Sequence, residues 1–105
     1  MDFFFNSNGS HLANMVRIQL HSPAGPNIGH YLPSHDIFID MTGRYLGEIV
    51  SPNRLMYNRF SAYRYLTFGA HGNYGNIGSY GTPGNDGDID AIAGYEDIDR
   101  ANLKG

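Results

Sequence analysis

Acidic residues near the C-terminus form the most regular set of candidate metal ligands. Asp86, Asp88 and Asp90 alternate along the chain, and Asp97 falls at the twelfth position counted from Asp86. This spacing is typical of a calcium-binding loop, which also requires glycine at the sixth position and a bidentate glutamate at the twelfth. Those two positions hold Ala91 and Asp97. We therefore expect no metal here and interpret the carboxylates as turn residues followed by the solvent face of an edge strand.

The histidines offer no pair with the spacing of a zinc site. No two of them are separated by three residues, and no pair of carboxylates accompanies them. We expect them to be solvated or hydrogen-bonded at the surface: His11, His21, His30, His35 and His71. The chain has no cysteine, which excludes disulfides, thiolate ligands and a cysteine nucleophile. No Gly-x-Ser-x-Gly sequence indicates a serine nucleophile either, so we predict a protein that is not an enzyme and uses no cofactor.

Arginine alternates with aromatic residues in the middle of the chain, and we predict that this set binds a partner. The residues are Arg54, Tyr57, Arg59, Tyr63 and Arg64. Aromatic and arginine side chains are enriched at interface cores. They can also stack on bases and contact phosphate, but a net charge of −3 argues against nucleic acid. A further alternative is internal, in which the arginines pair with the chain's own acids and tyrosine rings.

These observations favour a non-enzymatic interaction or structural module of unknown biological role. We predict that it self-associates or binds a protein partner. The alternative is a small-ligand or glycan binder that uses the tyrosines and asparagines of the glycine-rich stretch 71–80 to stack on sugars.

The residues above are set among repeated units that predict β-hairpins. Segment 37–49 (IFIDMTGRYLGEI) has the same layout as segment 3–15 (FFFNSNGSHLANM), and segment 55–61 (LMYNRFS) repeats its first half. In each unit a short apolar run ends at Asn or Asp, whose side chain can bond its own backbone two residues on. Glycine three residues later, or serine in the third unit, is expected to accept the positive φ that closes a four-residue turn with a bulge. A small residue then follows on the returning strand, where another backbone could approach closely.

The second half of the unit, read as apolar, small, variable and apolar, recurs along the chain. It is found at 12–15, 28–31, 46–49, 77–80 and 92–95, with a degenerate copy at 65–68. We predict a single all-β domain of repeated antiparallel hairpins in a pseudosymmetric arrangement, with repeats over 1–98 and a tail over 99–105. The predicted core consists of Phe4, Ile18, Ile28, Phe38, Leu46, Ile49, Met56, Ile77 and Ile92.

Three stretches need a choice between structures. Val16–Leu20 alternates apolar and polar residues, so we expect it to extend the first hairpin. Residues 52–66 could form a helix that begins at Pro52, but the repeat favours a strand at 55–57, a turn at 58–61 and a strand at 63–68. Glycine occupies every third position from Gly69 to Gly87, and we expect tight turns there because a collagen helix would require a longer run and more proline.

The composition agrees with a β protein and places it in the cytoplasm by default. Fourteen glycines, eight tyrosines and six phenylalanines in 105 residues indicate turn-rich β structure rather than helices. The N-terminal residues lack the basic and apolar regions of a signal peptide, and no apolar run is long enough to cross a membrane.

The repeated units resemble the bacterial four-fold β-flower domain. The resemblance covers residues 2–68 well and 69–95 loosely, through the FFFNSNGSHLANM, IFIDMTGRYLGEI and LMYNRFSAYRYL segments. It implies hairpins that meet around a shared axis, and it brings no activity and no catalytic residues with it. The Pro-rich loop at 22–27 and the Gly-rich stretch at 69–87 depart from a regular pattern. Segment 43–49 is also similar to PRC-barrel and MORN-type strands, which share the all-β architecture but not the topology.

Overall fold

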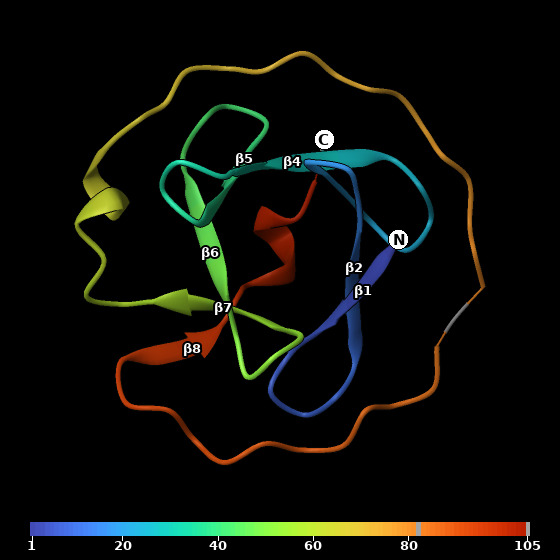
Figure 1. Cartoon of the computed structure of the whole chain (residues 1–105), viewed down its shortest axis with the longest axis vertical. Helices are drawn as coiled ribbons and strands as arrows, with labels where there is room; N and C mark the ends of the chain where they lie inside the picture. The colour runs from blue at the N-terminus through green and yellow to red at the C-terminus, as the bar shows by residue number, and fades with distance from the viewer. Residues whose placement is uncertain (82, 105) are drawn as a thin grey trace.

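Three β-hairpins of like design follow one another around a ring (Figure 1). The computed structural model describes residues 1–81 and 83–104, and Thr82 and Gly105 lie outside the described part. The hairpins pair β1 (Asp2–Phe5) with β2 (His11–Val16), β3 (Gln19–His21) with β4 (Asn27–Leu32), and β5 (Ile37–Asp40) with β6 (Tyr45–Val50). Consecutive strands pair antiparallel, and β7 (Arg54–Asn58) also pairs in parallel with β1, which closes a seven-stranded barrel. The prediction of a single all-β domain is confirmed.

The hairpin corners have the conformation expected from the repeated unit. Gly9 and Gly43 have φ values of 83° and 92°, and their N–H groups donate to the carbonyls of Asn6 and Asp40. The Asp40 side chain accepts from the N–H of Thr42 at 2.9 Å. A third corner of the same kind forms at Gly25, whose N–H donates to Ser22. The positive φ predicted at the corner glycines is therefore confirmed, because glycine adopts it without steric cost. The predicted side-chain hydrogen bond two residues on forms at Asp40, whereas the Asn6 side chain accepts from the N–H of Ser10.

The returning strand of each hairpin carries a β-bulge at the same place in the unit. The register shift puts one extra apolar residue on β2, β4 and β6, at Leu12, Ile28 and Leu46, and all three side chains are buried in the core. Burying each contributes about 2 kcal/mol. The small residue that follows is required at Gly29 and Gly47, because a Cβ atom there would meet the carbonyl oxygens of Ile39 and Met56.

The fourth hairpin is split. β7 ends in a turn in which the Ser61 N–H donates to Asn58, as predicted for 58–61. Ser61 has φ −67°, however, and its hydroxyl caps a 3-10 helix, η1 (Ala62–Tyr65), so the predicted strand at 63–68 and the copy at 65–68 are wrong. The partner of β7 is instead β8 (Tyr95–Asp97), which pairs with it antiparallel. A chain excursion of some thirty residues therefore separates the two halves of this hairpin.

The excursion runs once around the outside of the barrel, as the outer yellow-to-orange trace in Figure 1 shows. We call this segment, residues 66–94, the belt. Several of its glycines have an N–H that donates to a polar side chain two residues earlier, as in Gly75 to Asn73 and Gly78 to Asn76, both at 2.7 Å. The prediction of tight turns is wrong, because the described residues from 68 to 92 contain no turn closed by a main-chain hydrogen bond and the chain follows the outside of the barrel instead. The copies of the strand pattern at 77–80 and 92–95 are also wrong, because 77–80 and most of 92–95 belong to the belt.

The belt is attached to the three hairpin corners at intervals of nine residues. The N–H groups of Phe68, Ile77 and Asp86 donate to the carbonyls of Gly43, Gly25 and Gly9 at 2.8, 3.1 and 3.0 Å. A Cβ atom on any of these corner glycines would collide with belt atoms. The glycines therefore serve two purposes, since they form the corner and they leave room for the belt.

The core differs from the predicted one at three isoleucines. Ile18 is 45% exposed, because the chain turns at Arg17 (φ 56°) instead of extending the first hairpin through Val16–Leu20. Ile77 and Ile92 belong to the belt and are only partly buried. The C-terminal segment with η2 (Arg100–Asn102) crosses the middle of the ring (Figure 1), and there Ile98 and Leu103 pack on the core.

Candidate functional site

Arg54 is buried at the seam between β1 and β7 rather than exposed to a partner. Its guanidinium donates to the carbonyl oxygens of Asn6 and Gly87 at 3.1 and 2.6 Å, and to the main chain and carboxylate of Asp86 at 3.0 and 3.1 Å. Only 4% of the residue is exposed. The internal alternative considered for this arginine is the one that the structure shows, because the guanidinium joins the belt to the barrel.

Tyr57 and Tyr63 also belong to the packing of the molecule. Tyr57 contacts the ring of Tyr45, with 5.2 Å between centroids, and packs against the core. Tyr63 lies 5.3 Å from His35 and 6.0 Å from Phe68. Both tyrosines are partly buried.

Arg59 and Arg64 accompany an apolar surface that sequence reasoning only partly found. Phe60 and Tyr65 are 77% and 79% exposed, and Leu66 is also exposed. The guanidinium of Arg64 lies over the Tyr65 ring at 4.7 Å, and that of Arg59 lies over Phe60 at 5.9 Å. We call Arg59, Phe60, Arg64, Tyr65 and Leu66 the Arg–aromatic surface.

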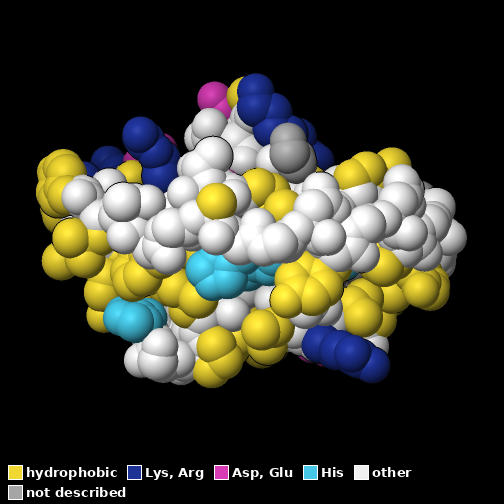
Figure 2. All heavy atoms as spheres, turned by 90° about the horizontal axis from the view of Figure 1, so that it is seen from above, with side chains coloured by type: hydrophobic (Ala, Val, Ile, Leu, Met, Phe, Trp, Pro, Cys, Tyr) yellow, Lys and Arg dark blue, Asp and Glu magenta, His cyan; other side chains and the backbone are white. Residues whose placement is uncertain are grey.

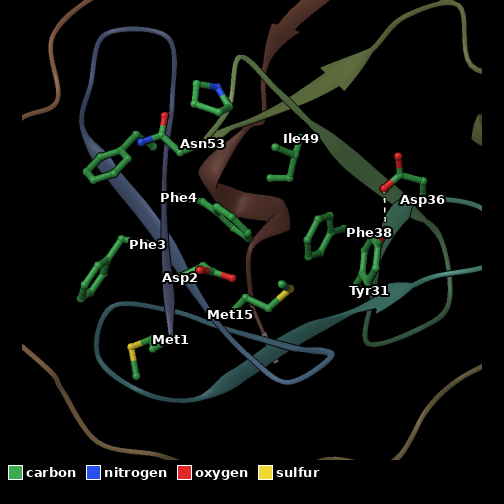
Figure 3. Close-up of a pocket in the computed structure, with 12 residues that line it drawn as sticks. Met1, Asp2, Phe3, Phe4, Met15, Tyr31, Asp36, Phe38, Ile49 and Asn53 are labelled. Carbon is green, nitrogen blue, oxygen red and sulfur yellow. Dashed lines mark hydrogen bonds between the residues drawn. The ribbon is translucent and has the colours of Figure 1, made fainter.

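A second candidate site is a cavity of about 590 Å³ at one end of the barrel (Figure 3). Met15, Tyr31 and Ile49 extend toward its centre from β2, β4 and β6, together with Phe4 and Phe38. The other lining residues are Met1, Asp2, Phe3, Phe5, Asp36, Pro52 and Asn53. Met15, Tyr31 and Ile49 occupy the last apolar position of the repeated pattern. The repeat itself is therefore the sequence signal that could have shown that these three side chains meet at one cavity.

The rim of the cavity is polar. The Tyr31 hydroxyl donates to the Asp36 carboxylate at 2.6 Å, and this hydrogen bond is the main cause of a raised pKa of Tyr31. Asp2 and Asn53 add a second carboxylate and an amide. No lysine or arginine is among the described residues that line the cavity.

The tyrosines proposed for sugar binding lie on the belt. Tyr74 and Tyr80 are 61% and 55% exposed, and neither lines the large cavity. The side-chain oxygens of Asn73 and Asn76 already accept from the belt's own N–H groups. The asparagines thus use these oxygens to shape the belt, and the glycan alternative stays a prediction.

Two histidines that we expected at the surface are buried beneath the belt. His21 and His30 are each 1% exposed, and His30 lies 5.0 Å from His71 and 5.7 Å from Tyr74 between ring centroids. Figure 2, which shows the belt edge-on, has histidine side chains directly against the pale band of the belt. The surface assignment is therefore wrong for these two, because belt residues lie over His30 and the buried His21 ring hydrogen-bonds the carbonyl oxygen of Gly25 at 2.7 Å.

We expect the protein to lose stability as the pH falls below 6.5. Burial is the main cause that lowers the pKa of His30 below 6.5, and His71 and His21 add to it. Because the unfolded chain then takes up a proton before the folded protein does, the stability from the neutral ring is complete above pH 6.5 and is lost as the pH falls toward the lowered pKa. Urea midpoints of the wild type and His30→Gln between about pH 7.5 and about pH 5 test this. Urea midpoints that change equally with pH in the two proteins would contradict this prediction.

The acidic series does not form a metal site within the described part of the chain. Asp86 faces Arg54, and the described residues contain no group of three or more histidine or acidic side chains that could hold a metal ion. No helix among them has the length and apolar character to span a bilayer.

The fold and these surfaces define a small, closed, mixed β-barrel wrapped by its own chain. No family model matches the chain, and no curated protein or solved structure matches it significantly. The resemblance to the four-fold β-flower domain stays a prediction.

Proposed function

We propose that the protein is a non-enzymatic interaction module that self-associates through the Arg–aromatic surface. The observation that carries this proposal is the exposure of Phe60 and Tyr65, the two most exposed large apolar residues among those described. Both rings lie beside a guanidinium within one short segment. Exposed aromatic rings next to arginine are typical of the centre of an interface rather than of a solvated face.

The surface suits a second copy of the chain because it carries complementary groups. Arg59 lies 3.8 Å from Glu96, and both side chains are about half exposed, so this weak ion pair can exchange partners between copies. A two-fold arrangement would place each ring and each guanidinium opposite the same surface of the other copy. The three hairpin corners that hold the belt in the same way also support the pseudosymmetric arrangement that we infer for the barrel.

We expect Tyr65→Ser to weaken self-association by at least about tenfold, the effect of losing roughly 1.4 kcal/mol at one interface anchor. Light scattering after size-exclusion chromatography over a dilution series measures the dissociation constant. Tyr80→Ser is the matched control, because Tyr80 is an exposed tyrosine on the belt outside this surface.

Two results would overturn the proposal. One is a wild-type protein that stays monomeric at about millimolar concentration, where even weak specific complexes form. The other is an equal loss of association in Tyr65→Ser and Tyr80→Ser.

A further inference from the structure

The two ends of the barrel differ in what covers the core. The C-terminal segment supplies Ile98 and Leu103 to the core, and neither residue lines the cavity. Around the cavity, Met15, Tyr31 and Ile49 pack against the core but stay only partly buried. The cavity of about 590 Å³ is thus an uncovered continuation of the core, and its volume lies in the range of small-molecule sites.

The lining favours a particular shape and charge of ligand. Five aromatic rings contribute to it, those of Phe3, Phe4, Phe5, Tyr31 and Phe38. Aromatic faces attract cations as well as apolar groups. Met15 adds a flexible, polarizable side chain that adapts to ligands of irregular shape.

The charges at the rim of the cavity also favour a cationic ligand. Asp2 and Asp36 contribute two carboxylates, and no lysine, arginine or histidine is among the described residues that line the cavity. Asp36 uses one carboxylate oxygen to accept from Tyr31, and its other oxygen is able to accept a further hydrogen bond. A ligand with an apolar body and one N–H donor at its end would bury the body and place the donor at the rim.

We propose that the open end of the barrel binds small apolar molecules that carry a protonated amine. This site is separate from the Arg–aromatic surface, since the two share no residue. Asp36 is the group that selects for charge, and Met15, Ile49 and Phe38 hold the apolar body.

The four methionines make the site directly observable. Met1 and Met15 line the cavity, whereas Met41 and Met56 do not. In protein labelled with 13C at the methionine methyl groups, titration with octylamine at neutral pH should shift the Met1 and Met15 signals to saturation. The Met41 and Met56 signals should stay in place and serve as the internal reference.

Charge selectivity is tested with probes of equal length. Octylamine should bind at least about threefold more tightly than 1-octanol and more tightly still than octanoate, because one partly solvated carboxylate contributes a modest Coulomb term. Asp36→Asn should reduce this preference, because only the Asp2 carboxylate then remains at the rim, while it keeps the octanol affinity. Asparagine tolerates the φ of 54° at this position and still accepts from Tyr31.

Asp88→Asn is the matched control, because it removes one exposed carboxylate from the belt, outside the cavity lining. Octanoate binding as tightly as octylamine would overturn the proposal. So would equal shifts of all four methionine signals, the absence of saturation, or an equal loss of preference in Asp36→Asn and Asp88→Asn.

Discussion

Replacing Gly25 by alanine is expected to lower the free energy of unfolding by about 3 kcal/mol, mainly by displacing the belt. Gly25 has φ 117°, a conformation that costs a residue with a Cβ atom about 1–2 kcal/mol. The added Cβ would also lie 2.6 Å from the Gly78 nitrogen and 2.8 Å from its oxygen, so the belt would have to move. Urea denaturation measures the loss, and amide exchange at Ile77 reports whether the belt has separated from this corner.

Substitutions at two other glycines distinguish the cost of the positive φ from the cost of the collision with the belt. Gly75 has φ 81° but open space around it, so Gly75→Ala should cost only the backbone term of about 1–2 kcal/mol. Gly72 has open space and no positive φ, so Gly72→Ala should change stability by less than about 0.5 kcal/mol. A Gly25→Ala protein no less stable than Gly75→Ala would show that the belt does not press on the corner.

Arg54→Met is expected to cost about 3 kcal/mol and to loosen the belt near Gly87. The substitution keeps most of the apolar volume but leaves the carbonyls of Asn6, Asp86 and Gly87 without their donor. Urea denaturation gives the total loss. Hydrogen exchange at the Asp86 N–H, which donates to the carbonyl of Gly9, gives the local loss of stability where the belt meets this corner.

Asp86→Asn is the control for this variant. The Asp86 side chain is 44% exposed, so water solvates it when the ion pair is lost, and the cost should stay below about 1 kcal/mol. Equal losses in Arg54→Met and Asp86→Asn would assign the stabilisation to the ion pair rather than to the main-chain carbonyls.

The local chemistry of the corners could be predicted from the sequence, whereas the path of the belt could not. Asp40 and Gly43 determine their turn by side-chain hydrogen bonding and positive φ, which are short-range effects. Ser61 stands where the other corners have glycine, and it caps a 3-10 helix instead of returning the chain. A serine at this position is compatible both with a turn and with a helix cap, so the local sequence does not distinguish the two.

The candidate sites depended on longer contacts, so they were only partly predictable. Arg59 and Arg64 lie at the surface beside exposed rings, as a partner-binding set requires, but Arg54 is covered by a segment more than thirty residues away in sequence. His30 is buried for the same reason, because Tyr74 and His71 of the belt lie over it. Alternation along a strand identifies its outward face and does not reveal that another segment covers that face.

The split of the fourth hairpin has a consequence for synthesis on the ribosome. β8 leaves the exit tunnel more than thirty residues after β7, yet it is the antiparallel partner of β7. The first three hairpins involve only neighbouring strands and can pair while translation continues. The nascent protein therefore presents an unpaired stretch of β7 until β8 emerges, and a chain terminated before Tyr95 would keep that edge available to other polypeptides.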